Sequence, residues 1–188
     1  MAAESLLSLV PDKAALIAAT ELRELIAQKL RCDAEYPNDI MLVRRGEERL
    51  RSPERATRLS GQHTVDYSTF GTSFNVWGMP PEWVKERLDN DIIFGSFAEG
   101  RLASVASLVA WLPRVSVIMG VETKPEFRGR GLGRIVVSAA VREGLRRSQS
   151  CTLFVRSDNE RAIGLYRALG FNKVGEELWI DVGTGIVP

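Results

Sequence analysis

A glycine-rich turn between a predicted strand and a predicted helix is the part of this sequence that most clearly suggests chemistry. The run Val121-Glu-Thr-Lys-Pro-Glu-Phe-Arg-Gly-Arg-Gly-Leu-Gly133 contains β-type residues, a proline and then three closely spaced glycines. Glycine lets backbone N–H groups approach an anion closely, and the dipole at a helix N-terminus favours negative charge. The pattern therefore predicts a site for the phosphates of a cofactor.

The spacing of these glycines argues against two common nucleotide-binding classes. Gly129, Gly131 and Gly133 are two positions apart, whereas the dinucleotide fingerprint places its third glycine one residue later. A P-loop requires Lys and then Ser or Thr after its last glycine, but Arg134 follows Gly133. What remains is the pattern Arg128-x-x-Gly131-x-Gly133.

A second segment, residues 159–171, combines helix signals with an apolar face that includes a tyrosine. Asn159 is a suitable N-cap and Gly170 a suitable helix stop. The apolar positions between them share one helical face: Ala162, Leu165, Tyr166 and Leu169. Taken alone, the segment also fits a short buried helix with Tyr166 in the core.

Together the two segments resemble the two signatures of the GNAT (Gcn5-related N-acetyltransferase) superfamily, Gln/Arg-x-x-Gly-x-Gly/Ala and Asn-x-x-Ala-x-x-Leu-Tyr-x-x-x-Gly-Phe. The resemblance covers roughly residues 92–180 and is nearest to the glycine-N-acyltransferase-like branch. It implies a mixed α/β (α+β) fold, with a mostly antiparallel central sheet flanked by helices. It also implies that two central strands splay apart to form an acyl-CoA cleft.

The resemblance implies a role for individual residues of this chain. Backbone of Val121 and Thr123 would pair with the pantetheine arm of acyl-CoA, and Asn159 would contact that arm. Tyr166 would lie beside the thioester sulfur and protonate the leaving thiolate. The pyrophosphate would be held by backbone amides of Arg128, Gly129, Arg130, Gly131, Leu132 and Gly133.

The sequence does not identify a general base. Histone-type relatives place a carboxylate eleven residues before the Gln/Arg of the first signature, and that position is Val117 here. Glu122 is the nearest strand carboxylate, although its side chain should face opposite to those of its two neighbours. It is either a residue that relays a proton through water or an ordinary exposed glutamate. His63 and Asp66 are weaker candidates.

The resulting hypothesis is an acyl-CoA-dependent N-acyltransferase. It would transfer acetyl from acetyl-CoA, or another acyl group from its CoA ester, to a primary amine of a small molecule or peptide by direct attack in a ternary complex. A non-catalytic acyl-CoA-binding regulatory module is the alternative, which Val117 in place of a carboxylate keeps open. A generic nucleotide-binding α/β protein would require the second signature to be accidental.

Composition limits the partners that we expect. The net charge of +1 gives no general attraction to nucleic acid or membranes, and no apolar run reaches the 18 residues of a membrane span. One histidine and two cysteines favour neither a metal site nor a disulfide framework. The N-terminus lacks the pattern of a signal peptide. We expect a cytoplasmic protein, monomeric or homodimeric.

The apolar patterns predict an N-terminal extension, residues 1–60, that is partly helical and packs on a GNAT domain at 61–188. In the extension we expect a helix over 13–31 capped by Asp12, a strand over 39–43, and a surface loop or poorly packed helix over 44–61. Residues 62–78 have strand-type content. Four aromatics there line an acceptor pocket or cover the sheet: Tyr67, Phe70, Phe74 and Trp77.

The remaining elements are expected in the order strand, strand, strand, helix, strand, helix, strand pair, after a short helix that begins at Pro80-Pro81 and ends near Asn90. The expected strands are 92–97, 102–111, 115–123, 152–156 and the pair 171–175 and 178–182, and the expected helices are 131–147 and 159–169.

Overall fold

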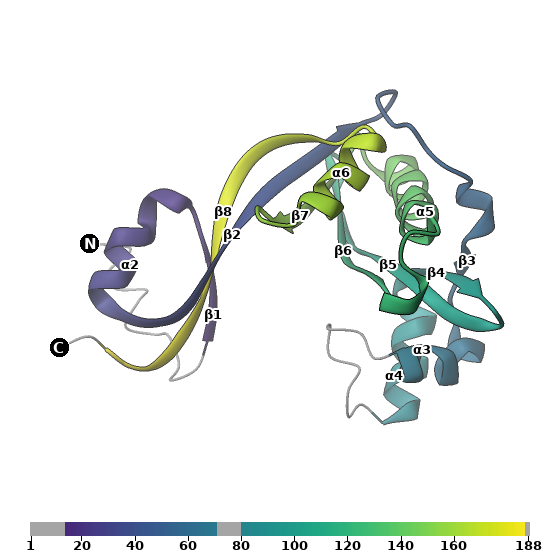
Figure 1. The fold of residues 1–188 in the computed structure, drawn as a ribbon, viewed down its shortest axis with the longest axis horizontal. Coiled ribbons are helices and arrows are strands. Elements are labelled where there is room, and N and C mark those ends of the chain that lie inside the picture. Colours follow the sequence, from purple (N-terminus) through teal and green to yellow (C-terminus); the bar gives the residue numbers. More distant parts are fainter. Residues whose placement is uncertain (1–13, 71–79, 187–188) are drawn as a thin grey trace. The chain divides into compact units, whose positions relative to one another are not determined.

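The computed structural model describes residues 14–70 and 80–186, which form eight strands and five α-helices. The strands hydrogen-bond in one sheet in the order β1-β8-β2-β7-β6-β5-β4-β3. Most of the pairings are antiparallel, and β6 and β7 are parallel. The chain thus has the mixed α/β, GNAT-like fold that the sequence predicts (Figure 1).

The chain divides into two compact units, which interleave along the sequence. The larger unit contains residues 41–153 and 161–172, and the smaller contains residues up to 40, 154–160 and those from 173 onward. Three strands and one helix contribute residues to both units: β2 (Leu30–Arg44), β7 (Ser150–Arg156), β8 (Asn172–Ile186) and α6 (Glu160–Ala168).

An antiparallel meander forms the centre of the larger unit. Its strands are β4 (Ile92–Ala98), β5 (Arg101–Trp111) and β6 (Val115–Thr123), with the two-residue β3 (Thr57–Arg58) paired to β4. Helix α5 (Leu132–Arg147) then connects β6 to the parallel strand β7. Parallel strands need such a crossover, so the glycine turn at the start of α5 is part of a strand–turn–helix unit.

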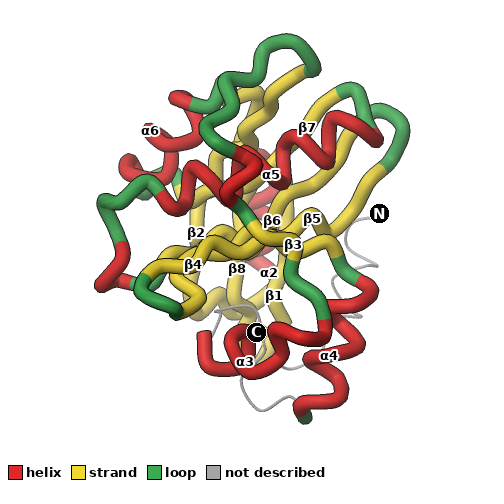
Figure 2. The backbone as a smooth tube through the Cα atoms, turned by 90° about the vertical axis from the view of Figure 1, so that its right-hand side faces the viewer, coloured by secondary structure: helices red, strands yellow, loops and turns green. Residues whose placement is uncertain are grey.

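Both faces of the meander are covered, which explains why β5 is apolar almost throughout. Leu102 packs in a buried cluster with α3 (Thr64–Phe70) and α4 (Pro81–Asn90), which lie side by side in Figure 2. The next residue, Ala103, packs in a different cluster with Leu132 and Ile135 of α5. Successive strand residues point to opposite faces, so α5 covers one face and α3 with α4 the other.

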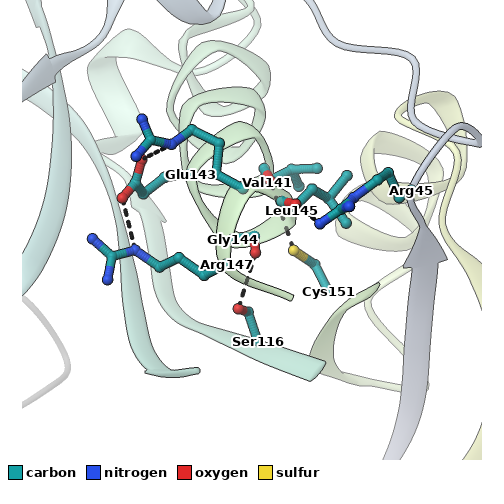
Figure 3. A network of polar contacts seen from close by, with 9 residues as sticks. Arg45, Ser116, Val141, Glu143, Gly144, Leu145, Arg147 and Cys151 are labelled. Carbon is teal, nitrogen blue, oxygen red and sulfur yellow. Dashed lines mark hydrogen bonds and ion pairs between the residues drawn. The ribbon is translucent and has the colours of Figure 1, made fainter. Parts of the chain in front are cut away.

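Polar contacts anchor the C-terminal end of α5 (Figure 3). The last carbonyls of a helix lack intrahelical donors. Arg45 Nη2 donates to the carbonyls of Leu145 at 2.6 Å and Ser148 at 2.9 Å, and Ser116 Oγ donates to the Gly144 carbonyl at 3.2 Å. These bonds fix the helix at the end opposite the glycine turn.

The thiol of Cys151 lies fully buried beneath this end of α5. Its Sγ is 3.7 Å from the Val141 carbonyl, and burial raises its pKa from 9.0 to about 12. The native state therefore resists ionisation of a thiol that the unfolded chain ionises above pH 9. The stabilising contribution is complete below pH 9 and is lost as the pH rises from there toward 12.

We expect a measurable loss of stability in mild alkali from this one thiol. Between pH 7 and pH 10 ionisation of Cys151 in the unfolded chain should remove about 1.4 kcal/mol. Urea unfolding of the wild type and of Cys151→Ser at the two pH values measures the difference. Serine keeps a donor to the Val141 carbonyl but does not titrate. An equal loss in both proteins would contradict the prediction.

The smaller unit has its own strands and a small core. It contains β1 (Ala14–Ala18), the 3₁₀ turn Thr20–Leu22, α2 (Arg23–Lys29) and parts of β2 and β8. Strand β1 pairs antiparallel with β8, from Ala14 opposite Val182 to Ala18 opposite Leu178. Ile26, Leu178 and Ile180 form the buried cluster.

Four predictions in the N-terminal half are wrong or incomplete. The helix expected over 13–31 is instead strand β1, a 3₁₀ turn and the short α2, because β8 offers β1 a pairing edge that overrides the helical pattern. Residues 64–70 form helix α3 rather than strand. The strand expected over 39–43 is the end of the longer β2, and the charged loop at 44–61 includes β3 and two 3₁₀ turns.

The C-terminal strand pair is also wrong, since β8 runs unbroken from Asn172 to Ile186. From residue 81 to residue 170, however, every predicted helix and strand is present with ends shifted by at most two residues. Phe74, Trp77 and the proposed cap Asp12 lie outside the described residues. The extension at 1–60 stays a prediction. No helix in the described ranges is long and apolar enough to cross a membrane.

Candidate functional site

Strand β6 stops pairing with β7 before its own C-terminal end, and it contains a β-bulge in that part. Its parallel pairing with β7 covers Val115–Ile118, and β6 then continues to Thr123. Ser107 lies opposite Met119 but Val105 opposite Glu122, so β6 carries one extra residue there, beside Gly120 at φ +60°. A bulge re-aims the strand that contains it.

Alternation along this end of β6 sets which backbone groups face away from β5. The Lys124 N–H donates to the Ala103 carbonyl at 3.0 Å, and the Glu122 carbonyl accepts from Ser104 Oγ at 2.8 Å. Both groups face β5, so the backbone of Thr123 faces the opposite edge. Pairing of Val121 and Thr123 with pantetheine stays a prediction, and Arg128 Nε already donates to the Thr123 carbonyl at 3.2 Å.

The glycine turn forms an open concave backbone at the N-terminus of α5. Gly129 and Gly131 have φ of +81° and +78°, a region that only glycine adopts readily, and Gly131 is the N-cap. A Cβ added at either would meet no atom of the described residues within 4 Å. The first intrahelical bonds are donated by Arg134 and Ile135, both to the Gly131 carbonyl. The amides of residues 129–133 make no hydrogen bond to any residue that the structure describes, which leaves them available to an anion.

Gly133 is required for a different reason, the packing of three elements. A Cβ there would lie 3.2 Å from Leu165 Cδ1 and 3.3 Å from Thr123 Oγ1. Packing therefore requires glycine at 133, whereas a Cβ at Gly131 would meet no described atom within 4 Å. At Gly133 the end of β6, the start of α5 and helix α6 meet.

The second signature folds as a helix stop that positions its tyrosine. The N–H of Phe171 donates to the Tyr166 carbonyl and that of Gly170 to the Arg167 carbonyl, both at 3.1 Å. This is a Schellman motif, with Gly170 at φ +99°. The apolar contact that accompanies such motifs is an edge-on pair of the Tyr166 and Phe171 rings, 5.9 Å between centroids.

We expect Gly170→Ala to destabilise the protein by about 3 kcal/mol, because a Cβ would overlap the Glu47 carbonyl oxygen and the positive φ is strained. Gly164→Ala in the same helix is the matched control, since a Cβ there meets nothing within 4 Å and alanine favours helix. Urea unfolding compares the two. Equal stability of the two variants would refute the requirement for glycine at 170.

The environment of Tyr166 keeps its hydroxyl protonated. The residue is 6% exposed, and burial raises its pKa to about 12. No hydrogen bond joins its hydroxyl to another side chain or backbone group of residues 14–70 and 80–186. A buried tyrosine normally finds a partner, so this donor is available to a ligand.

The positions of the other predicted site residues do not establish their roles. Asn159 directly precedes α6, and its N–H donates to the Arg156 carbonyl at 2.9 Å. Glu122 is half-buried on β6. The catalytic role of Glu122 and the cofactor contact of Asn159 stay predictions. His63 Nδ1 accepts from the Ser60 N–H at 3.1 Å in a capping box, and Asp66 lies in the first turn of α3.

Of the aromatics proposed for an acceptor pocket, Tyr67 and Phe70 are core residues. They are 2% and 5% exposed and pack with Val84 and Leu88 of α4. This agrees with the interpretation that they cover the sheet.

Sequence reasoning missed Ser104, which lies fully buried on β5. Its Oγ bonds the Glu122 carbonyl and the Thr123 Oγ1, both at 2.8 Å, so it fastens the bulged end of β6. The signal was present, because a serine within an apolar strand must find a hydrogen-bond partner when it is buried.

Comparison with known proteins agrees with this geometry. Residues 97–180 match the family described as FR47-like protein. A 51-residue segment is 43% identical to an uncharacterized protein of Mycobacterium leprae, covering 27% of this chain and 14% of that protein. The chain therefore spans a small part of the curated relative that it matches.

Two solved structures show the likeness of fold. A GNAT-family protein of Novosphingobium aromaticivorans has a TM-score of 0.71 at 22% identity, over 96% of this chain and 79% of that one. A GNAT-family acetyltransferase of Colwellia psychrerythraea has a TM-score of 0.61 at 13% identity, over 97% and 73%. The chain therefore has a GNAT-like fold, and its residues 97–180 are similar to the FR47-like family.

Proposed function

We propose that this protein is an acyl-CoA-dependent N-acyltransferase that transfers acetyl to a primary amine by direct attack in a ternary complex. The observation that carries the proposal is the meeting of three elements at Gly133. Thr123 ends β6, Gly133 begins α5 beside the open glycine turn, and Leu165 directly precedes Tyr166 on α6. The glycine turn, the end of β6 and the helix that contains Tyr166 thus meet in one region of the larger unit.

The residues of this region fit acyl-CoA. The left-handed Gly129 and Gly131 and the first amides of α5 form a cradle for the pyrophosphate, and the strand edge at Thr123 suits the amide-containing pantetheine arm. Bound acyl-CoA would supply an activated thioester.

The chain then has two tasks, to orient an amine and to stabilise the leaving sulfur. Tyr166 is suited to the second, since a pKa of about 12 keeps its O–H as a donor at every physiological pH. A phenol with this pKa is a weaker acid than a thiol, so Tyr166 acts by a hydrogen bond to the developing thiolate. Overall the amine nitrogen gives up one proton and the sulfur gains one.

A non-catalytic acyl-CoA-binding module is the second candidate, and one observation favours it. Histone-type relatives have a carboxylate at the position of Val117, which lies in the part of β6 that pairs with β7. The valine side chain cannot act as a base. A poorly basic amine, however, can lose its proton without a protein base.

Isothermal titration with acetyl-CoA, with ATP and NAD as controls, tests the proposal first. We expect acetyl-CoA to bind saturably with micromolar affinity, and ATP and NAD not to bind. In a screen of primary amines with acetyl-CoA, we then expect release of the CoA thiol. Binding without turnover across the screen, together with no effect of Tyr166→Phe, would support the module. No binding by folded, CoA-free protein would refute both.

A further inference from the structure

Two arginines cover a buried phenylalanine beside the glycine turn. The guanidinium carbons of Arg101 and Arg130 lie 4.9 Å and 5.2 Å from the centroid of the Phe127 ring. Phe127 is 1% exposed and packs with Leu132 and Ile135 of α5. A planar cation over an aromatic face is held by both packing and electrostatics, so the heads of these arginines are ordered.

The carboxylate of Glu99, in the turn between β4 and β5, contacts both arginines. Glu99 Oε1 accepts a hydrogen bond from Arg130 Nη1 at 2.6 Å, and Glu99 Oε2 is 3.8 Å from Arg101 Nη2. The hydrogen bond from Arg130 lowers the pKa of Glu99, which keeps the carboxylate charged. Arg130 belongs to the glycine turn, yet its side chain extends away from the turn to the loop between β4 and β5.

The backbone at Glu99 is strained, which indicates a role for its side chain. Glu99 and Gly100 form the two-residue turn between β4 and β5, with φ of +54° and +71°. Such turns favour Asn or Asp followed by Gly, and glutamate is uncommon in the left-handed region. Strain of this kind persists where the surrounding structure holds it and often marks a functional position. Here the strained residue is the one that orders both arginines.

The cluster keeps donors and positive charge available to an anion. Two guanidinium groups face one carboxylate, which leaves one net positive charge, and the side chains of Arg101 and Arg130 are 59% and 50% exposed. Each guanidinium has five N–H donors, and the pairing with Glu99 uses only part of them. Arg128, by contrast, is turned back onto the Thr123 carbonyl.

We propose that Arg101 and Arg130, held by Glu99 over Phe127, bind the 3′-phosphate of coenzyme A. The inference rests on the proposed acyl-CoA function. A CoA ester carries two anionic groups near its adenosine end, a pyrophosphate and a phosphomonoester on the ribose. Backbone amides of the glycine turn suit the first, and an ordered pair of guanidinium groups that begins in the same turn suits the compact dianion.

Titration calorimetry with CoA and with dephospho-CoA, which lacks only this phosphate, tests the inference. We expect the wild type to bind CoA on the order of tenfold more tightly than dephospho-CoA. Arg130→Gln and Arg101→Gln keep an aliphatic stem and a planar head over Phe127 but remove the charge. Each should weaken CoA binding and leave dephospho-CoA binding unchanged. Arg142→Gln, an exposed position in the middle of α5, controls for net charge and should leave both affinities unchanged.

The outcomes separate this inference from the function on which it rests. Equal binding of CoA and dephospho-CoA by the wild type would overturn the 3′-phosphate subsite while leaving acyl-CoA binding in place. An equal loss of both affinities in Arg130→Gln would assign this arginine to the pyrophosphate and overturn the subsite too. Failure of the wild type to bind either ligand would remove the proposed function together with the inference.

Discussion

Replacing Gly131 with glutamate should abolish acetyl-CoA binding while the fold survives. A Cβ at Gly131 would meet no described atom within 4 Å, so the new side chain begins without a clash. It does place a carboxylate where the cradle would hold a pyrophosphate, and like charges at close range in a partly desolvated site repel strongly. We expect the dissociation constant to rise at least on the order of 100-fold. The positive φ should cost only about 1 kcal/mol of stability.

A second glycine provides the matched control for this substitution. Gly46 lies in the turn after β2 at φ +93°, and a Cβ there also meets nothing within 4 Å. Gly46→Glu therefore introduces the same strain and the same charge away from the cradle. Titration calorimetry of both variants, with circular dichroism to establish folding, makes the comparison. Unaltered affinity in Gly131→Glu, or an equal loss in Gly46→Glu, would refute the cradle.

The second half of the fold was predictable from sequence because its local signals and its tertiary structure agree. The strand of residues 115–123 has its predicted ends, and Gly170 stops α6 as its sequence position indicates. At these places turn chemistry, capping and the apolar pattern all favour the same structure. The signatures at 128–133 and 159–171 could be recognised for the same reason, since most of their residues are needed by the backbone itself.

The first part of the chain was not predictable because tertiary pairing decides it. Residues 14–18 contain Ala, Leu and Ile, which suit either a helix or a strand, and β8 selects the strand. Tyr67 and Phe70 suggest a strand by type, yet they pack one helical turn apart against α4. Local patterns contain no information about such distant partners.

The sequence indicated which residues to expect in the candidate site, but not which contacts require some of them. Gly133 is small because Leu165 and Thr123 pack against it, and Ser104 fastens the bulge in β6. Both depend on contacts between residues that lie 10 to 32 positions apart in sequence. A motif shows which residue types occur at which spacing, whereas the structure shows which neighbouring atoms require each residue type.

Tyr166→Phe should lower kcat on the order of 100-fold and leave the dissociation constant of acetyl-CoA nearly unchanged. The substitution removes one oxygen whose hydrogen is not bonded to any other described residue. The ring keeps its contact with Phe171, and the two Schellman bonds, to the Tyr166 and Arg167 carbonyls, belong to the backbone. Stability and binding should therefore be retained, and the loss should appear in the chemical step alone.

The raised pKa of Tyr166 adds a pH dependence to this prediction. With a pKa of about 12 the hydroxyl stays protonated throughout the neutral and mildly alkaline range. Wild-type kcat should therefore show no decrease attributable to this tyrosine below about pH 11. Any decrease of kcat with rising pH below about pH 11 must come from another group, and the same decrease should be present in Tyr166→Phe.

The experiment needs the amine that gives the fastest thiol release and a second buried tyrosine as control. Tyr67, which is 2% exposed in the cluster beneath β5, is the matched residue, and Tyr67→Phe should retain kcat. Single-turnover measurements establish that chemistry limits the rate. An unchanged kcat in Tyr166→Phe under that condition would remove this hydroxyl from the mechanism. An equal decrease in Tyr67→Phe would instead attribute the loss to packing, because only one of the two hydroxyls lies on the helix that meets the glycine turn.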